Sequence, residues 1–165
     1  MAKSFEYSEE ITYALERVHA TVTDPAFWQH RFEKSPEKLT LDASRGPGTL
    51  TVIMRDSIGA SSLPAIVSKV VTGELKVERI DEWGALDGGR ADGRIGGSST
   101  GIPVLIQSTS VLRPLGDGGT VLEVAGSVEV KVPVVGGQIE TVIKKMVGDM
   151  FGQDRTAIEK WLGDS

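Results

Sequence analysis

The sequence predicts an α+β fold in which a curved antiparallel sheet of seven strands wraps around one long C-terminal helix. Two observations lead to this prediction. Apolar and polar residues alternate in several runs up to residue 132, the pattern of half-buried strands. After Gly136 and Gly137 the apolar spacing becomes helical and continues to Leu162. Because strands and helices are segregated along the chain, the sheet is expected to be antiparallel.

Length and composition limit the possible functions. The 165 residues are expected to form a single domain, residues 1–165, large enough for a core and a cavity. A net charge of -5 argues against nucleic acid, whose binding proteins need a basic surface. We expect no signal peptide, no stable membrane insertion and, without cysteine, no disulfide. These features favour a cytoplasmic protein, either a monomer or a homodimer.

The first part of the chain predicts one strand followed by two short helices. Residues 4–8 alternate and are expected to form the strand. Asp24 and Pro25 fit the N-cap and the first position of the second helix. Ser8 fits the N-cap of the first helix, which would bury Ile11, Ala14, Leu15, Val18 and Val22.

The middle of the chain predicts the other six strands. A hairpin is expected from residues 38–43 and 50–54, because Arg45 to Gly48 forms a turn between two alternating runs. Residues 57–62 are expected to be a loop, and residues 63–71 a short apolar helix or lid. Glycine-rich turns then separate strands at residues 75–83, 90–100, 104–112 and 120–132. The final helix is expected to run from about Gln138 to Leu162.

Several short strings are characteristic of a known superfamily. They are Asp24-Pro25-Ala26-Phe27, Leu63-Pro64, Trp83-Gly84, the run from Val130 to Gly137 with Ile139-Glu140, and Lys160-Trp161-Leu162. With them the chain resembles the START-like or helix-grip superfamily, which includes the birch pollen allergen and polyketide cyclases. More narrowly, it resembles a bacterial branch known only as a domain of unknown function. The resemblance implies the helix-grip fold but no particular ligand, since the superfamily includes lipid carriers, hormone receptors and ring-closing enzymes.

The leading functional hypothesis is a non-catalytic protein that binds or carries a hydrophobic or amphipathic small molecule of lipid, fatty acyl, polyketide or isoprenoid type. Its cavity would lie between the sheet and the C-terminal helix, with affinity supplied mainly by burial of apolar surface. Small residues such as Gly93 and Gly97 on one strand face indicate either this cavity or close packing. The expected ligand-binding residues are Val52, Met54, Val77, Arg79, Asp81, Trp83, Gly93, Ile95, Gln107, Val124, Val128, Met146, Met150 and Asp154.

Three of these residues are charged. Asp154 falls within the apolar stripe of the terminal helix, so it lines the cavity, forms an ion pair, or caps the helix after a break at Gly152. Arg79 and Asp81 share a strand face with Leu75. If that face points inward, Arg79 reaches the cavity and could bind a ligand carboxylate; otherwise both residues face water. We expect Arg79 and Asp154 to act in orientation or charge pairing more than in bond breaking.

Two other classes of function stay open from the sequence. A cyclase, dehydratase or hydrolase-like enzyme would use Asp154 and Arg79, with Tyr7 or Tyr13, as acid, base or oxyanion donor. An interaction protein with a collapsed cavity would act through its surface. The two histidines lack metal-binding spacing, and no nucleophile or nucleotide motif is present. No catalytic residue, metal site or cofactor is therefore predicted.

Overall fold

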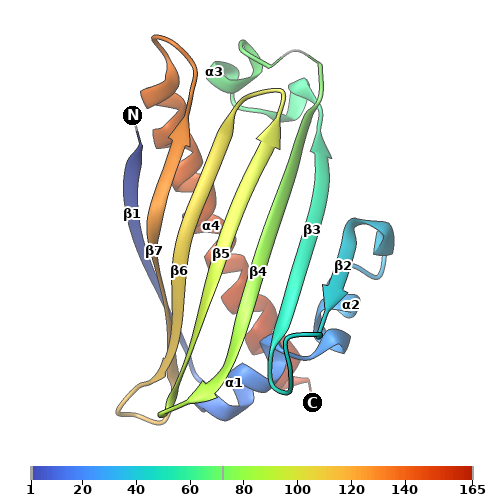
Figure 1. Cartoon of the computed structure of the whole chain (residues 1–165), viewed down its shortest axis with the longest axis vertical. Helices are drawn as coiled ribbons and strands as arrows, with labels where there is room; N and C mark the ends of the chain where they lie inside the picture. Colours follow the sequence, from blue (N-terminus) through green and yellow to red (C-terminus); the bar gives the residue numbers. More distant parts are fainter. Residues whose placement is uncertain (1, 72, 165) are drawn as a thin grey trace.

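The computed structural model describes residues 2–71 and 73–164, and it confirms the predicted fold (Figure 1). In this part of the chain seven strands form one antiparallel sheet in the order β1-β7-β6-β5-β4-β3-β2. The strands are β1 Lys3–Ile11, β2 Leu39–Asp42, β3 Leu50–Ile58, β4 Leu75–Asp87, β5 Arg90–Thr100, β6 Val104–Pro114 and β7 Thr120–Val130.

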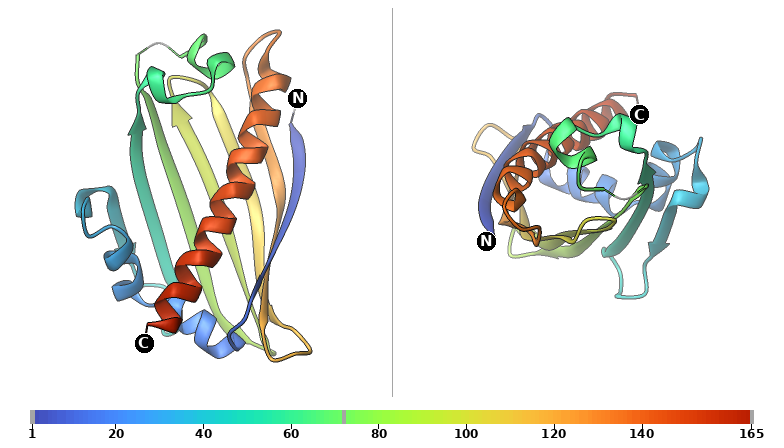
Figure 2. Two further views of the ribbon diagram at one scale, coloured as in Figure 1. Left: turned by 180° about the vertical axis from the view of Figure 1, so that it is seen from behind. Right: turned by 90° about the horizontal axis from the view of Figure 1, so that it is seen from above.

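The helices lie on the inner side and at the two ends of this curved sheet (Figure 2). The long helix α4 crosses the inner side obliquely and packs mainly on β1 and β7. Helix α1 lies at one end of the sheet and α3 at the other. The helices are α1 Leu15–Val22, α2 Pro25–Arg31, α3 Ala65–Ser68 and α4 Gly136–Gly163, with short 3-10 turns at Pro36–Lys38 and Ala60–Ser62.

Helix α4 continues without interruption through Gly152. A glycine inside a helix costs about 1 kcal/mol relative to alanine. The buried side chains of Phe151 and Ile158 offset this cost, because they anchor the helix on both sides of the glycine. The alternative in which Asp154 caps a broken helix is therefore wrong.

The predicted boundary between the first strand and the first helix is also wrong. Strand β1 continues past Ser8 to Ile11, and α1 begins only at Leu15. The reason is a non-local interaction: β1 pairs with β7 over its whole length, so that Ile11 lies opposite Thr120. The ladder of backbone hydrogen bonds outweighs a single N-cap at Ser8.

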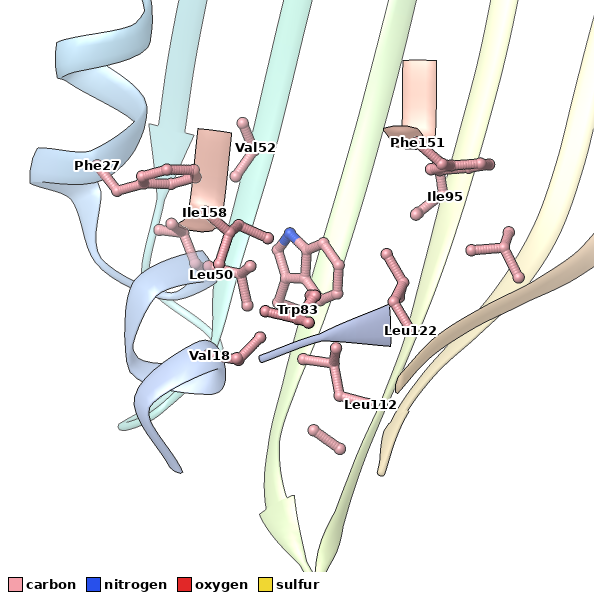
Figure 3. Packing of buried hydrophobic residues seen from close by; sticks show 14 of the residues in the cluster. Val18, Phe27, Leu50, Val52, Trp83, Ile95, Leu112, Leu122, Phe151 and Ile158 are labelled. Atoms are coloured by element: carbon pink, nitrogen blue, oxygen red, sulfur yellow. The ribbon is translucent and has the colours of Figure 1, made fainter. Parts of the chain in front are cut away.

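Two clusters of buried apolar residues form the core. The larger cluster lies beside α1 and α2, and Figure 3 shows Trp83 within it, surrounded by Leu50, Leu122 and Ile158. The smaller cluster brings α3 together with β7 and the start of α4. Its buried members are Val67, Leu75, Ile102, Val128, Val130 and Ile139.

Gly126 on β7 gives a test of how closely the strands pack. A methyl group at this position would overlap the carbonyl oxygen of Gln107 and the side chain of Ser108. We expect Gly126→Ala to lower the free energy of unfolding by about 1–3 kcal/mol, as overpacking usually does. The matched control is Gly116→Ala in the turn before β7, where an added Cβ meets no atom within 4 Å. Equal urea denaturation curves for the two variants would contradict the packing described here.

Candidate functional site

A cavity of about 560 Å³ lies between the sheet and α4. Its walls come from β3, β4, β5 and β6 on one side and from α3 and α4 on the other. Residues of both core clusters line it, so it occupies the region where the two clusters meet. Its apolar walls include Met54, Val77, Ile95, Ile106, Met150 and Phe151.

The small residues of β5 have two different roles. A Cβ on Gly97 would meet the side chain of Ile106 at 3.4 Å, an ordinary contact, and Gly97 lines the cavity. A Cβ on Gly93 would lie only 2.5 Å from the carbonyl oxygen of Glu82 and 2.8 Å from Oγ of Ser110. Gly93 is therefore a site of close packing, and its predicted place in the cavity is wrong. Both alternatives given for the small residues of this strand therefore apply: the cavity at Gly97 and close packing at Gly93.

Some of the other predicted residues line the cavity, and the rest do not. Met54, Val77, Arg79, Ile95, Met146 and Met150 line the cavity. Side chains packed around α1 and α2 fill the neighbouring end of the sheet, where Val52, Trp83 and Val124 are buried in solid core. The predicted residues that do not line the cavity are Val52, Asp81, Trp83, Gly93, Gln107, Val124, Val128 and Asp154.

Gln107 is on the opposite face of the sheet from the one predicted. Its neighbours Ile106 and Ser108 line the cavity. Gln107 is exposed and lines a depression that Arg94 and Thr109 also border. The physical reason is strand alternation: side chains change face at every residue, so Gln107 faces outward when Ile106 and Ser108 face the cavity.

Arg79 of β4 lies between two carboxylates. Its Nε and Nη2 donate to Oδ1 and Oδ2 of Asp81, each at 2.8 Å. Nη2 also donates to Oδ2 of Asp154 on α4 at 2.7 Å, and Nη1 to its Oδ1 at 3.5 Å. Arg31 of α2 donates from Nη1 to Oδ1 of Asp154 at 3.0 Å. These four residues, called the Arg–Asp network below, join β4, α4 and α2.

The Arg–Asp network is buried and electrically balanced. The side chains of Arg79, Asp81 and Asp154 are 13%, 0% and 7% exposed, and that of Arg31 is 24% exposed. Burial would lower the pKa of Arg79, but the carboxylates of Asp154 and Asp81 outweigh it and raise that pKa. Burial raises the pKa of Asp81, and the guanidinium of Arg79 opposes this effect. Two cations and two anions leave no surplus charge.

Arg31 is the member of the network that the sequence analysis missed. It follows Phe27 and Trp28 by four and three residues, so all three lie on one face of α2. Its guanidinium lies 5.7 Å from the ring centre of Phe27 and 5.3 Å from that of Trp28. The spacing of an arginine on the apolar face of a short helix was the signal that could have identified it.

No metal centre is found in the described residues, where no group of three or more His, Asp or Glu side chains is placed to hold an ion. Within residues 2–71 and 73–164, no helix is long and apolar enough to cross a membrane.

Comparison with known proteins agrees with this fold. A family model described as "Protein of unknown function (DUF2505)" matches residues 6–162. An uncharacterized protein of Mycobacterium tuberculosis is 26% identical over 170 residues, with 98% of each chain covered. A Streptomyces aromatase/cyclase has a TM-score of 0.59 at 12% identity, covering 97% of this chain and 93% of that chain. A START superfamily protein from Mycobacterium smegmatis has a TM-score of 0.52 at 16% identity, covering 98% and 97%. These two solved structures confirm the START-like, helix-grip fold expected from the sequence.

The Arg–Asp network predicts strong coupling between β4 and α4. Arg79→Met and Asp154→Leu are each expected to lower the free energy of unfolding by about 3–5 kcal/mol, because each leaves the buried network with one uncompensated charge. The double variant is expected to lose clearly less than the sum of the two. Urea denaturation of the wild type, both single variants and the double variant measures this coupling.

The matched control is the same cycle on Arg113 and Glu123, an ion pair in which both side chains are nearly half exposed. Solvent screens such a pair, so both variants should be close to neutral and additive. Equal behaviour of the two cycles would contradict the role assigned to Arg79 and Asp154.

Proposed function

The chain belongs to the DUF2505 family, and we propose that it binds or carries a hydrophobic or amphipathic small molecule in the cavity between the sheet and α4. The cavity is the observation that supports this proposal. Its volume of about 560 Å³ lies within the usual range for small-molecule sites. Protein interiors are otherwise close-packed, and empty apolar volume lowers stability. A ligand that fills this space offsets that cost.

The wall chemistry favours an apolar ligand. Three methionines, Met54, Met146 and Met150, face the cavity, and their flexible thioether side chains adapt to irregular shapes. Burial of apolar surface contributes about 25 cal/mol per Å², so an acyl or polycyclic ligand of moderate size gains affinity without many polar contacts. Met146 is 43% exposed while it also lines the cavity, which supports an opening to solvent beside α4.

The same contacts support binding more than catalysis. Tyr7, a candidate acid in the enzyme hypothesis, does not line the cavity and donates its hydroxyl hydrogen to the carbonyl of Lys144. Arg79 and Asp154, two further candidates, form an ion pair with one another. The acidic net charge and the absence of cysteine support a cytoplasmic carrier with a small-molecule partner rather than a nucleic acid.

Gly97→Trp tests the proposal by filling the cavity. An added Cβ is tolerated at Gly97, and a larger side chain extends into the space that the ligand would occupy. Binding of Nile red, a neutral apolar dye, is expected to weaken by about tenfold or more, as the buried apolar area is lost. Dye fluorescence titration measures the affinity, and circular dichroism checks the fold.

The matched control is Gln107→Trp, which adds the same indole to the exposed face of the neighbouring strand. It should leave the dye affinity unchanged. Native mass spectrometry of the purified wild type should also show a co-purified apolar compound, or take one up when it is added. Failure of the wild type to bind the dye or any added apolar compound would refute the proposed function.

A further inference from the structure

Every charged residue that lines the cavity is already paired with an opposite charge. Arg55 and Glu78 form an ion pair with an N–O distance of 3.0 Å. Asp56 accepts a hydrogen bond from Nζ of Lys38 at 2.8 Å. Arg79 belongs to the Arg–Asp network, in which two cations face two anions. Among the described residues, the cavity therefore has no cation in excess that could neutralise an anionic ligand.

Three polar side chains of the wall, Arg79, Ser99 and Ser108, already form hydrogen bonds within the protein. Arg79 has five N–H donors. Four hydrogen bonds to Asp81 and Asp154 use four of them, and the fifth, on Nη1, has no acceptor among the described residues. The hydroxyls of Ser99 and Ser108 donate to backbone carbonyls, each at 2.6 Å, so their oxygens act as acceptors toward a ligand. One neutral oxygen at the ligand's polar end can accept a hydrogen bond from the remaining N–H of Arg79.

On the basis of the proposed binding function, we propose that the cavity selects neutral ligands with a single hydroxyl, ester or ketone oxygen and discriminates against carboxylates. An ionised carboxylate would lose its hydration in the cavity and gain no unpaired cation in return. A neutral oxygen loses far less hydration than a carboxylate does, and it accepts a hydrogen bond from the free N–H of Arg79. The apolar part of such a ligand extends from Arg79 along the wall toward Leu63 and Val67 beside α3.

The test compares two ligands of equal chain length, 1-dodecanol and dodecanoate, as competitors of Nile red at neutral pH. In the wild type the alcohol is expected to bind at least about tenfold tighter than the ionised acid, because only the acid carries an unpaired charge into the cavity. Equal affinity, or tighter binding of dodecanoate, would overturn the selectivity.

The ionised acid is more soluble in water than the alcohol, and this alone weakens its binding. Asp154→Asn separates that effect from selectivity by the protein. The variant leaves one cation in excess in the Arg–Asp network, so the preference for the alcohol is expected to fall by about tenfold. Glu123→Gln is the matched control, because it makes the same change in total charge at an exposed ion pair away from the cavity. The ratio of the affinities of this control variant for dodecanol and dodecanoate should equal that of the wild type.

Arg31→Gln covers the case in which Asp154→Asn does not fold. Arg31 is the most exposed member of the network, and its replacement leaves one anion in excess. Dodecanoate should then bind more weakly, while dodecanol binds as before. Ratios that do not change in any folded network variant would refute the ligand class and leave the proposed function standing. Failure of Nile red itself to bind the wild type would instead refute the proposed function.

Discussion

The ion pair between Arg79 and Asp154 fixes the long helix over the sheet. Helix α4 packs mainly on β1 and β7 at one edge, and this ion pair joins its last third to β4, far across the sheet. Arg31 of α2 also pairs with Asp154, so α2 is joined to the same part of α4. Buried ion pairs contribute little net stability, but mispairing them is costly, so they restrict alternative arrangements more than they stabilise one. The helix is thus held in a position that leaves space above β5.

The predictable part of the fold depended on local patterns. Alternation identified the strands, and the change to helical spacing after Gly137 identified α4. The error at Ser8 arose where a local signal competed with a distant one, since pairing with β7 keeps the chain extended to Ile11. No nearby residue reports on a strand more than a hundred positions later in the chain.

The candidate site was also predictable only where a local sequence pattern defined it. Position along α4 placed Asp154 within the apolar stripe, whereas position along β4 left open whether Arg79 faces inward or toward water. The structure buries both side chains. Whether an inward residue meets open space depends on its neighbours in the folded chain. Gly93 does not, because it packs closely against Glu82 of β4 and Ser110 of β6. Gln107 had no strong pattern to define its face. Arg31 was missed because its short helix offers only two turns of periodicity.

The pairing of β1 with β7 has a consequence for biosynthesis. Phe5 lies opposite Gly126, and Nζ of Lys3 donates to the carbonyl of Gly137 at 2.7 Å. The first strand of this sheet is therefore completed by its last strand, and α4 follows later still. Contacts between segments so distant in sequence form slowly, and apolar strand surface stays exposed until they form. The sheet consequently reaches its final strand order only after β7 has been synthesised.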